Sequence, residues 1–119
     1  MNRQFPDYRN ENIMNAQPIT VRKNASVDFP GIKISGDVLY LADKNALVLI
    51  DSETGGPERL SVNLDAYGLT PRPGFVFIKD WSEGAGVAAS LAKDGLVEIT
   101  ASHMVGPFST TAYEVRVVL

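Results

Sequence analysis

The stretch NALVLIDSETGGPERLSVNL, residues 45–64, decides how the rest of the chain can fold. It begins with an apolar run, 46–50, and ends with a run that alternates apolar and polar residues, 60–64. Between the two runs lie acidic and small polar residues, followed by a Gly-Gly-Pro sequence that favours a turn. Two β-type runs around such a turn predict an antiparallel hairpin, so the organising element is a meandering β-sheet.

Further runs with strand character flank this hairpin on both sides. They are residues 19–23, 27–29, 32–40, 75–79, 96–100 and 112–119. The segments between them are rich in turn-forming residues and predict turns or loops: 24–26, 30–31, 43–45, 70–74 and 101–111. Gly36 interrupts an otherwise strand-like run and predicts a bulge or a bend at that point.

One segment has the pattern of a helix. Ser82 suits the N-cap position, and Glu83 places negative charge in the first turn, where the helix dipole favours it. Gly95 suits the left-handed residue that ends a helix. Small and apolar residues recur between them on one face: Val87, Ala88, Leu91 and Ala92. The sequence therefore predicts an α+β fold, a strongly bent antiparallel sheet of five to seven strands with one helix, about residues 83–94, packed across it.

Length and composition set the domain organisation. A chain of 119 residues fits one domain that buries roughly two-thirds of the surface its unfolded form exposes. Residues 1–17 are rich in Asn, Arg and Gln and show no periodicity, so we predict a flexible N-terminal arm followed by a single α+β domain over 18–119. Phe5, Tyr8 and Ile13 leave open the alternative that the arm packs on the body or on a partner.

Composition also argues against several functional classes. The chain has no cysteine, so disulfides and thiolate metal sites are excluded. Its apolar runs are far shorter than the ~20 residues that cross a bilayer, and its start lacks a signal-peptide pattern, so we expect a cytoplasmic protein without membrane contact. Basic residues form no stripe, and the net charge is −3, which disfavours direct nucleic-acid binding. An acidic surface suits a basic protein partner, although mild negative charge also simply maintains solubility.

No group of residues carries a catalytic pattern. His103 is the only histidine, and serines and threonines lie near it in the predicted loop 101–111, but no Gly-x-Ser-x-Gly motif occurs. Asp51, Glu53 and Glu58 lie in the predicted hairpin turn without the ligand spacing of a calcium loop. We therefore predict no enzyme activity, no metal and no cofactor. The three acids form either a solvated turn or a contact for a partner.

Two aromatic residues are further candidates for partner binding. Large aromatic side chains are enriched at binding hot spots. Trp81 lies at the junction between a predicted strand and the helix, and is either a core residue beneath the helix or part of an interface. Tyr67 follows the hairpin and is either a surface anchor or a cover over the core.

Three motifs carry a resemblance to known proteins: LSVNL at 60–64, FVFIKDWSE at 75–83 and DGLVE at 94–98. With the short helix between the last two, they resemble a family of small uncharacterised proteins, a domain of unknown function, found in bacteria, phages and conjugative plasmids. The resemblance implies no catalytic residue. It does imply a setting on mobile genetic elements, from which we expect an inhibitor of host defence.

The functional expectation combines these points. We expect a small non-enzymatic protein-binding module, an anti-defence protein similar to an anti-CRISPR, that blocks a basic nucleic-acid-binding surface of a host defence component. The alternative is a structural or accessory phage or plasmid protein that forms homo-oligomers, since an exposed edge strand also allows a homodimer. The candidate contact residues are Tyr67, Trp81, Asp51, Glu53 and Glu58.

Overall fold

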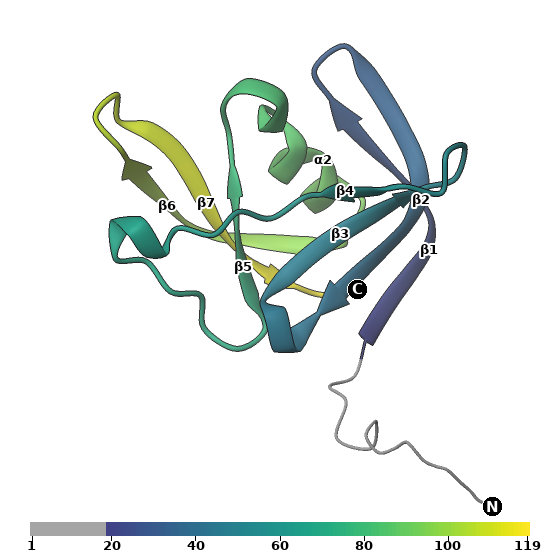
Figure 1. Ribbon diagram of the computed structural model, residues 1–119, viewed down its shortest axis with the longest axis horizontal. Helices are drawn as coiled ribbons and strands as arrows, with labels where there is room; N and C mark the ends of the chain where they lie inside the picture. The colour runs from purple at the N-terminus through teal and green to yellow at the C-terminus, as the bar shows by residue number, and fades with distance from the viewer. Residues whose placement is uncertain (1–18) are drawn as a thin grey trace, which may run out of the picture.

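The computed structural model describes residues 19–119, so the predicted arm, 1–17, lies outside the described residues. The described part contains seven strands, one α-helix and three 3-10 turns (Figure 1). The strands are β1 (Ile19–Phe29), β2 (Ile32–Leu41), β3 (Ala46–Asp51), β4 (Pro57–Arg59), β5 (Phe75–Lys79), β6 (Val97–Val105) and β7 (Thr110–Val117). The helix is α2 (Val87–Lys93), and the 3-10 turns are η2 (Ala42–Lys44), η3 (Asp65–Tyr67) and η4 (Ser82–Gly84).

The strands form two antiparallel sheets, in the orders β1-β2-β3-β4 and β5-β7-β6. The α+β class with one helix is confirmed, whereas the single bent sheet is replaced by two sheets. The chain passes from one sheet to the other directly after β4. Leu60 and Ser61 both donate their backbone N–H to the Leu47 carbonyl, and Val62 then donates to the Phe77 carbonyl at 2.8 Å. Val62 and Phe77 form the isolated β-bridge that joins the sheets.

The hairpin predicted within residues 45–64 forms, but its second strand lies earlier than expected. The Asp51 N–H donates to the Gly56 carbonyl at 2.9 Å and the Gly55 N–H donates to the Asp51 carbonyl at 2.8 Å, so the turn is tight. Pairing therefore starts at Pro57, which faces Ile50, and ends at Arg59. The alternating run 60–64 is the crossing segment rather than a strand of this hairpin.

Strands β1 and β2 form one long hairpin in place of the shorter runs that the sequence predicted. The segment 24–26, expected as a turn, lies within β1, and the pairing shifts register between Arg22 and Ala25. The extra residue is accommodated at Asn24, which has φ +57° and donates its N–H to Asp37 Oδ1 at 3.1 Å. The bulge thus lies on β1, opposite the position predicted at Gly36. At Gly36 itself a Cβ would lie 1.8 Å from the Ile50 carbonyl oxygen, so glycine is required for the close approach of β3.

The helix is shorter than the predicted range 83–94, and its predicted N-cap is wrong. Ser82 has φ +55° and begins the 3-10 turn η4, while the N-cap of α2 is Gly86 at φ +82°. The Asp80 carboxylate accepts the Gly86 N–H at 2.8 Å and fixes this entry. The C-terminal end follows the prediction, because Gly95 takes a left-handed conformation and Leu96 donates to the Leu91 carbonyl at 2.9 Å.

The predicted loop 101–111 is also wrong. Strand β6 continues to Val105 and β7 begins at Thr110, so only a short turn separates them. A second bulge lies between Ile99 and Ala101, after which regular pairing resumes, with His103 opposite Ala112. This hairpin extends to the upper left in Figure 1.

The core has a main part and a smaller satellite. The main core fills the space between the two sheets and α2, with Val27, Leu47, Leu49, Ile78 and Val115 among its fully buried side chains. The satellite is made of Leu64, Phe77, Val105 and Ala112 beneath the crossing segment and η3. Within residues 19–119, no helix has the length and apolar character that crossing a membrane requires.

Candidate functional site

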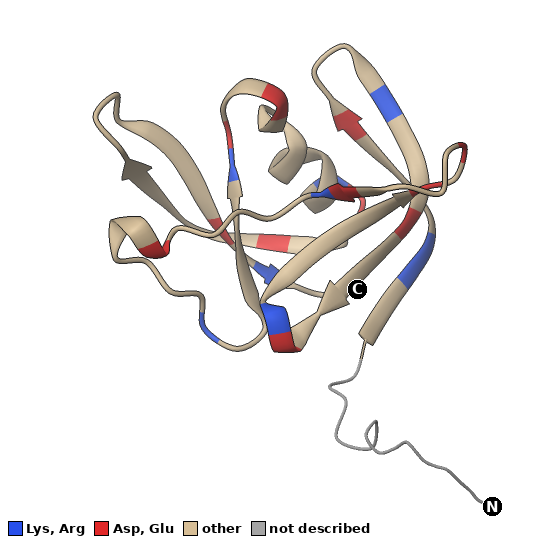
Figure 2. Ribbon diagram, in the orientation of Figure 1, with Lys and Arg blue, Asp and Glu red and all other residues tan. Residues whose placement is uncertain are grey.

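The three candidate acids lie on one hairpin but do not converge. Asp51 and Glu53 are at the turn between β3 and β4, where Asp51 Oδ1 accepts the Glu53 N–H at 2.8 Å, and Glu58 lies on β4. Figure 2 shows acidic residues at this turn. None of the three forms an ion pair with a described residue. Between residues 19 and 119, no three His, Asp or Glu side chains are grouped closely enough to hold a metal. We call this segment, 51–58, the acidic hairpin.

Trp81 is mainly a packing residue. Its half-buried side chain lies against the satellite core, and the Lys79 ammonium lies 5.8 Å from its ring centroid. The structure therefore favours the core interpretation of Trp81. His103 also packs, with its ring edge-on to Phe77 at 5.7 Å between centroids.

Tyr67 is exposed and borders the β6–β7 turn. Its side chain is 53% exposed, and a Cβ built at Gly106 would lie 3.5 Å from its hydroxyl oxygen. Two apolar side chains that sequence reasoning missed belong to the same hairpin: Met104 is 74% exposed and Phe108 is 87% exposed. We call Tyr67, Met104 and Phe108 the apolar tip. The sequence signal was present, since residues 101–112 contain no Asp, Glu, Lys or Arg.

The apolar tip rests on a well-supported hairpin. Val105 and Ala112, at the base of the turn, are buried in the satellite core. The Thr110 hydroxyl donates to the Val105 carbonyl at 3.0 Å, and the Ser109 N–H donates to the Gly106 carbonyl at 3.2 Å. Phe108 and Met104 leave most of their surface exposed, and Tyr67 leaves about half of its surface exposed.

A groove of about 430 Å³ opens between the β1–β2 turn, β4 and η4. Apolar side chains form its floor and walls: Phe29, Ile32, Ile34, Leu60, Val62 and Val87. Charged residues line its rim: Glu58, Arg59, Lys79 and Glu83. Lys79 and Glu83 form an ion pair with each other, and the hydrogen bond from Lys79 lowers the pKa of Glu83 to about 2. One candidate acid, Glu58, thus belongs to the groove as well as to the acidic hairpin.

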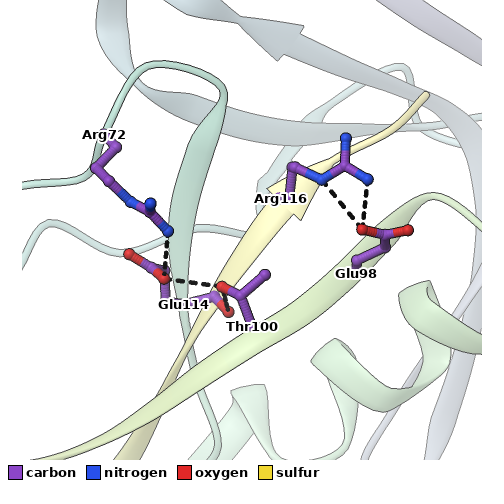
Figure 3. A network of polar contacts seen from close by, with 5 residues as sticks. All are labelled: Arg72, Glu98, Thr100, Glu114 and Arg116. Atoms are coloured by element: carbon purple, nitrogen blue, oxygen red, sulfur yellow. Dashed lines mark hydrogen bonds and ion pairs between the residues drawn. The ribbon is translucent and has the colours of Figure 1, made fainter.

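The outer face of the second sheet carries a polar network (Figure 3). Arg72 donates to Glu114 at 3.0 Å, the Thr100 hydroxyl donates to the same carboxylate oxygen at 2.8 Å, and Arg116 donates to Glu98 at 3.0 Å. The Thr100 hydroxyl is the main cause of the lowered pKa of Glu114, partial burial opposes it, and Arg72 lowers the pKa further. The charged groups on this face pair with one another, so we assign the network a role in stabilising the sheet rather than in binding.

Strands β1 and β6 lie at the outer edges of the two sheets. Ile19 and Val21, at 57% and 43% exposed, lie on β1 before its bulge. Further along β1, the Asp28 N–H donates a hydrogen bond to the Ser90 hydroxyl of α2 at 3.0 Å. The bulge in each outer strand, together with Pro57 on β4, shortens the continuous edge available for pairing. A homodimer through an edge strand stays a prediction.

The functional interpretation depends on this geometry. Comparisons of the chain with protein-family models, with curated proteins and with solved structures found no match. The resemblance of residues 60–98 to a family on mobile elements accordingly stays a prediction.

Proposed function

We propose that the protein is a small non-enzymatic protein-binding module that holds its partner through the apolar tip. The observation that carries the proposal is that Met104 and Phe108, on the two sides of the β6–β7 turn, leave most of their side chains exposed, while Tyr67 borders Gly106 in the same turn. Aromatic residues and methionine are enriched in the central part of protein interfaces.

The support beneath the tip strengthens this proposal. Val105 and Ala112 anchor the hairpin in the satellite core, so its backbone is ordered before a partner arrives. A preordered hairpin loses little conformational entropy on binding, and more of the gain from apolar burial then appears as affinity.

The acidic hairpin indicates the charge of the partner surface. Asp51, Glu53 and Glu58 would attract a basic surface, and such charge complementarity raises association rates. We further propose that this surface is a nucleic-acid-binding face of a host defence component, which would make the module an anti-defence protein similar to an anti-CRISPR. The support is the acid excess of the chain and its resemblance to proteins of mobile elements. A cytoplasmic location belongs to the same proposal.

A capture experiment tests the proposal. The tagged chain is incubated with lysate from a host that carries CRISPR or restriction systems, and bound proteins are identified by mass spectrometry. A Met104→Ser/Phe108→Ser variant should lose a stoichiometric partner, whereas an Ile19→Ser/Val21→Ser variant, which removes exposed apolar side chains elsewhere, should retain it. Equal capture by both variants would refute the role of the tip.

The acidic hairpin is tested in the same assay. Asp51→Asn, Glu53→Gln and Glu58→Gln together should slow association and flatten its dependence on salt. Unchanged association kinetics would remove the basic surface from the proposal and leave the apolar contact standing.

The alternative function is a phage or plasmid structural or accessory protein that forms homo-oligomers. A specific observation favours it: the same chain carries an exposed apolar tip and an apolar groove.

A further inference from the structure

We propose that Met104 is a site of reversible oxidation, and that a hydroperoxide acting on it releases the partner held by the apolar tip. The inference rests on the proposed function, because it adds redox control to the same contact. It commits to one modification, the conversion of the Met104 thioether to a sulfoxide, and to one class of oxidant.

Sulfur occurs in this chain only as the thioether of methionine. The sequence has no cysteine and three methionines, at positions 1, 14 and 104. Only Met104 lies in the described range 19–119, where its side chain is 74% exposed. The thioether is a soft and polarisable group, and methionine is a common target of oxidants. Because the chain offers no thiol to a peroxide, its accessible thioethers are the groups that react.

The alternation of side chains along β6 explains why Met104 faces solvent. Successive side chains of a strand point to opposite faces of the sheet. On one side of Met104, His103 packs edge-on against Phe77. On the other side, Val105 is buried in the satellite core, so Met104 points away from that core. Neither cluster of buried side chains among residues 19–119 includes Met104, and a peroxide molecule therefore reaches it without opening the fold.

The reaction is a two-electron oxidation by a hydroperoxide. With hydrogen peroxide, a lone pair of the Met104 sulfur attacks one peroxide oxygen, the S–O bond forms and the O–O bond breaks. The transferred hydroxyl gives its proton to the leaving hydroxide, which departs as water. Sulfur is oxidised and the peroxide is reduced, so the step needs no other co-reactant. Methionine sulfoxide reductases reverse the change.

Oxidation at this position changes the surface and leaves the fold intact. A sulfoxide inside a core disrupts packing, but Met104 lies outside both clusters and its backbone position is fixed by pairing with Thr111. The hydrogen bond from the Thr110 hydroxyl to the Val105 carbonyl, at the base of the turn, does not involve the sulfur. Within an apolar contact, however, the sulfoxide oxygen would be a buried acceptor without a donor. We expect this to weaken partner binding by about tenfold or more.

Peroxide treatment of the full chain tests the modification site. Purified protein is exposed to hydrogen peroxide, and peptide mapping by mass spectrometry follows the addition of one oxygen atom at each methionine. Met104 should be converted at a rate close to that of methionine in a short peptide. The thermal unfolding midpoint should stay that of the untreated protein. Resistance of Met104 to oxidation in the folded chain, or a midpoint that falls with its conversion, would overturn the inference.

Partner capture tests the consequence of the modification. After the peroxide is removed, oxidised wild type should recover about a tenth or less of the partner that untreated wild type captures from host lysate. Treatment with methionine sulfoxide reductases A and B should restore capture. A Met104→Leu variant, compared with its own untreated sample, should not respond to peroxide, whereas Met14→Leu should respond as wild type does. An equal response of the two variants would overturn the inference.

Two results separate this inference from the proposed function. If the Met104→Ser/Phe108→Ser variant loses the partner while oxidised wild type keeps it, the tip holds the partner and only the redox control fails. If that double variant keeps the partner, or if untreated wild type captures none, the proposed function fails and the inference fails with it.

Discussion

Ser61 offers the sharpest test of the crossing between the sheets. Its side chain is 2% exposed, and its hydroxyl oxygen accepts the backbone N–H of Leu47 at 2.9 Å. The hydroxyl therefore replaces a strand partner at the point where β4 ends. Ser61→Ala leaves the N–H of a fully buried residue without this acceptor, which costs about 1–3 kcal/mol of unfolding free energy. Because the hydrogen bond from Arg59 to the same oxygen is only partly buried, its loss adds little.

Urea denaturation followed by tryptophan fluorescence measures this effect. With a slope of about 1–3 kcal/mol per molar urea, a loss of about 2 kcal/mol lowers the midpoint by roughly 1 M while the slope stays unchanged. Ser26→Ala is the matched control, because its hydroxyl contacts the Ser35 hydroxyl at an exposed site and its loss should cost less than about 0.5 kcal/mol. Equal midpoints for the two variants would refute the bridging role of Ser61.

Three further predictions follow from individual contacts. Gly36→Ala should destabilise the fold by about 3 kcal/mol or more, because its Cβ would lie 1.8 Å from a backbone oxygen of β3, whereas Gly56→Ala should be nearly neutral in the same urea titration. Tyr40→Phe should cost about 1 kcal/mol in thermal unfolding, since the tyrosine hydroxyl accepts the Gly74 N–H at 3.1 Å; an unchanged melting temperature would contradict this. The pKa of Glu114 in the folded state lies below its ordinary value of 4.5. The ionised Glu114 carboxylate therefore stabilises the fold fully above pH 4.5, and this stabilisation is lost as the pH falls through the folded-state pKa. The stability difference between wild type and Glu114→Gln should accordingly shrink on acidification from pH 7, and a difference that grows would contradict the assignment.

Local signals in the sequence were sufficient for part of the fold. The first strand and the turn of the β3–β4 hairpin, the turn at Pro30-Gly31 and the helix end at Gly95 all depend on residues close together in the chain, and these were predicted; the second strand of the hairpin was expected at 60–64 and lies at Pro57–Arg59. The start of α2 was not predicted, because Ser82 and Glu83 have good capping chemistry while the deciding contact is the Asp80 side chain bound to Gly86.

The division into two sheets could not be predicted from the sequence. The run 60–64 alternates like a strand, and only the pairing of Val62 with Phe77, far along the chain, shows that it crosses between sheets. The β6–β7 hairpin was missed for a related reason, since its partners are set by a bulge at Thr100 and by polar residues that also suit loops.

The candidate site was predicted only in part. Tyr67 was named and is exposed, but its neighbours Met104 and Phe108 fell in a segment interpreted as a loop. Whether an apolar side chain is exposed depends on which distant residues pack over it, and the local sequence does not indicate those residues. Glu58 was named for its charge, while its position at the groove follows from the strand order.

The two bulges and the proline on β4 have a consequence for the protein at high concentration. Growth of a β fibre requires an uninterrupted unpaired strand of about six residues. On β1 and β6 the regular stretches, such as 25–29 and 101–105, are shorter than that, and a kink follows or precedes each one. A molecule with two open sheets is thereby protected from polymerising through them, and concentrated stocks should stay free of thioflavin-positive material.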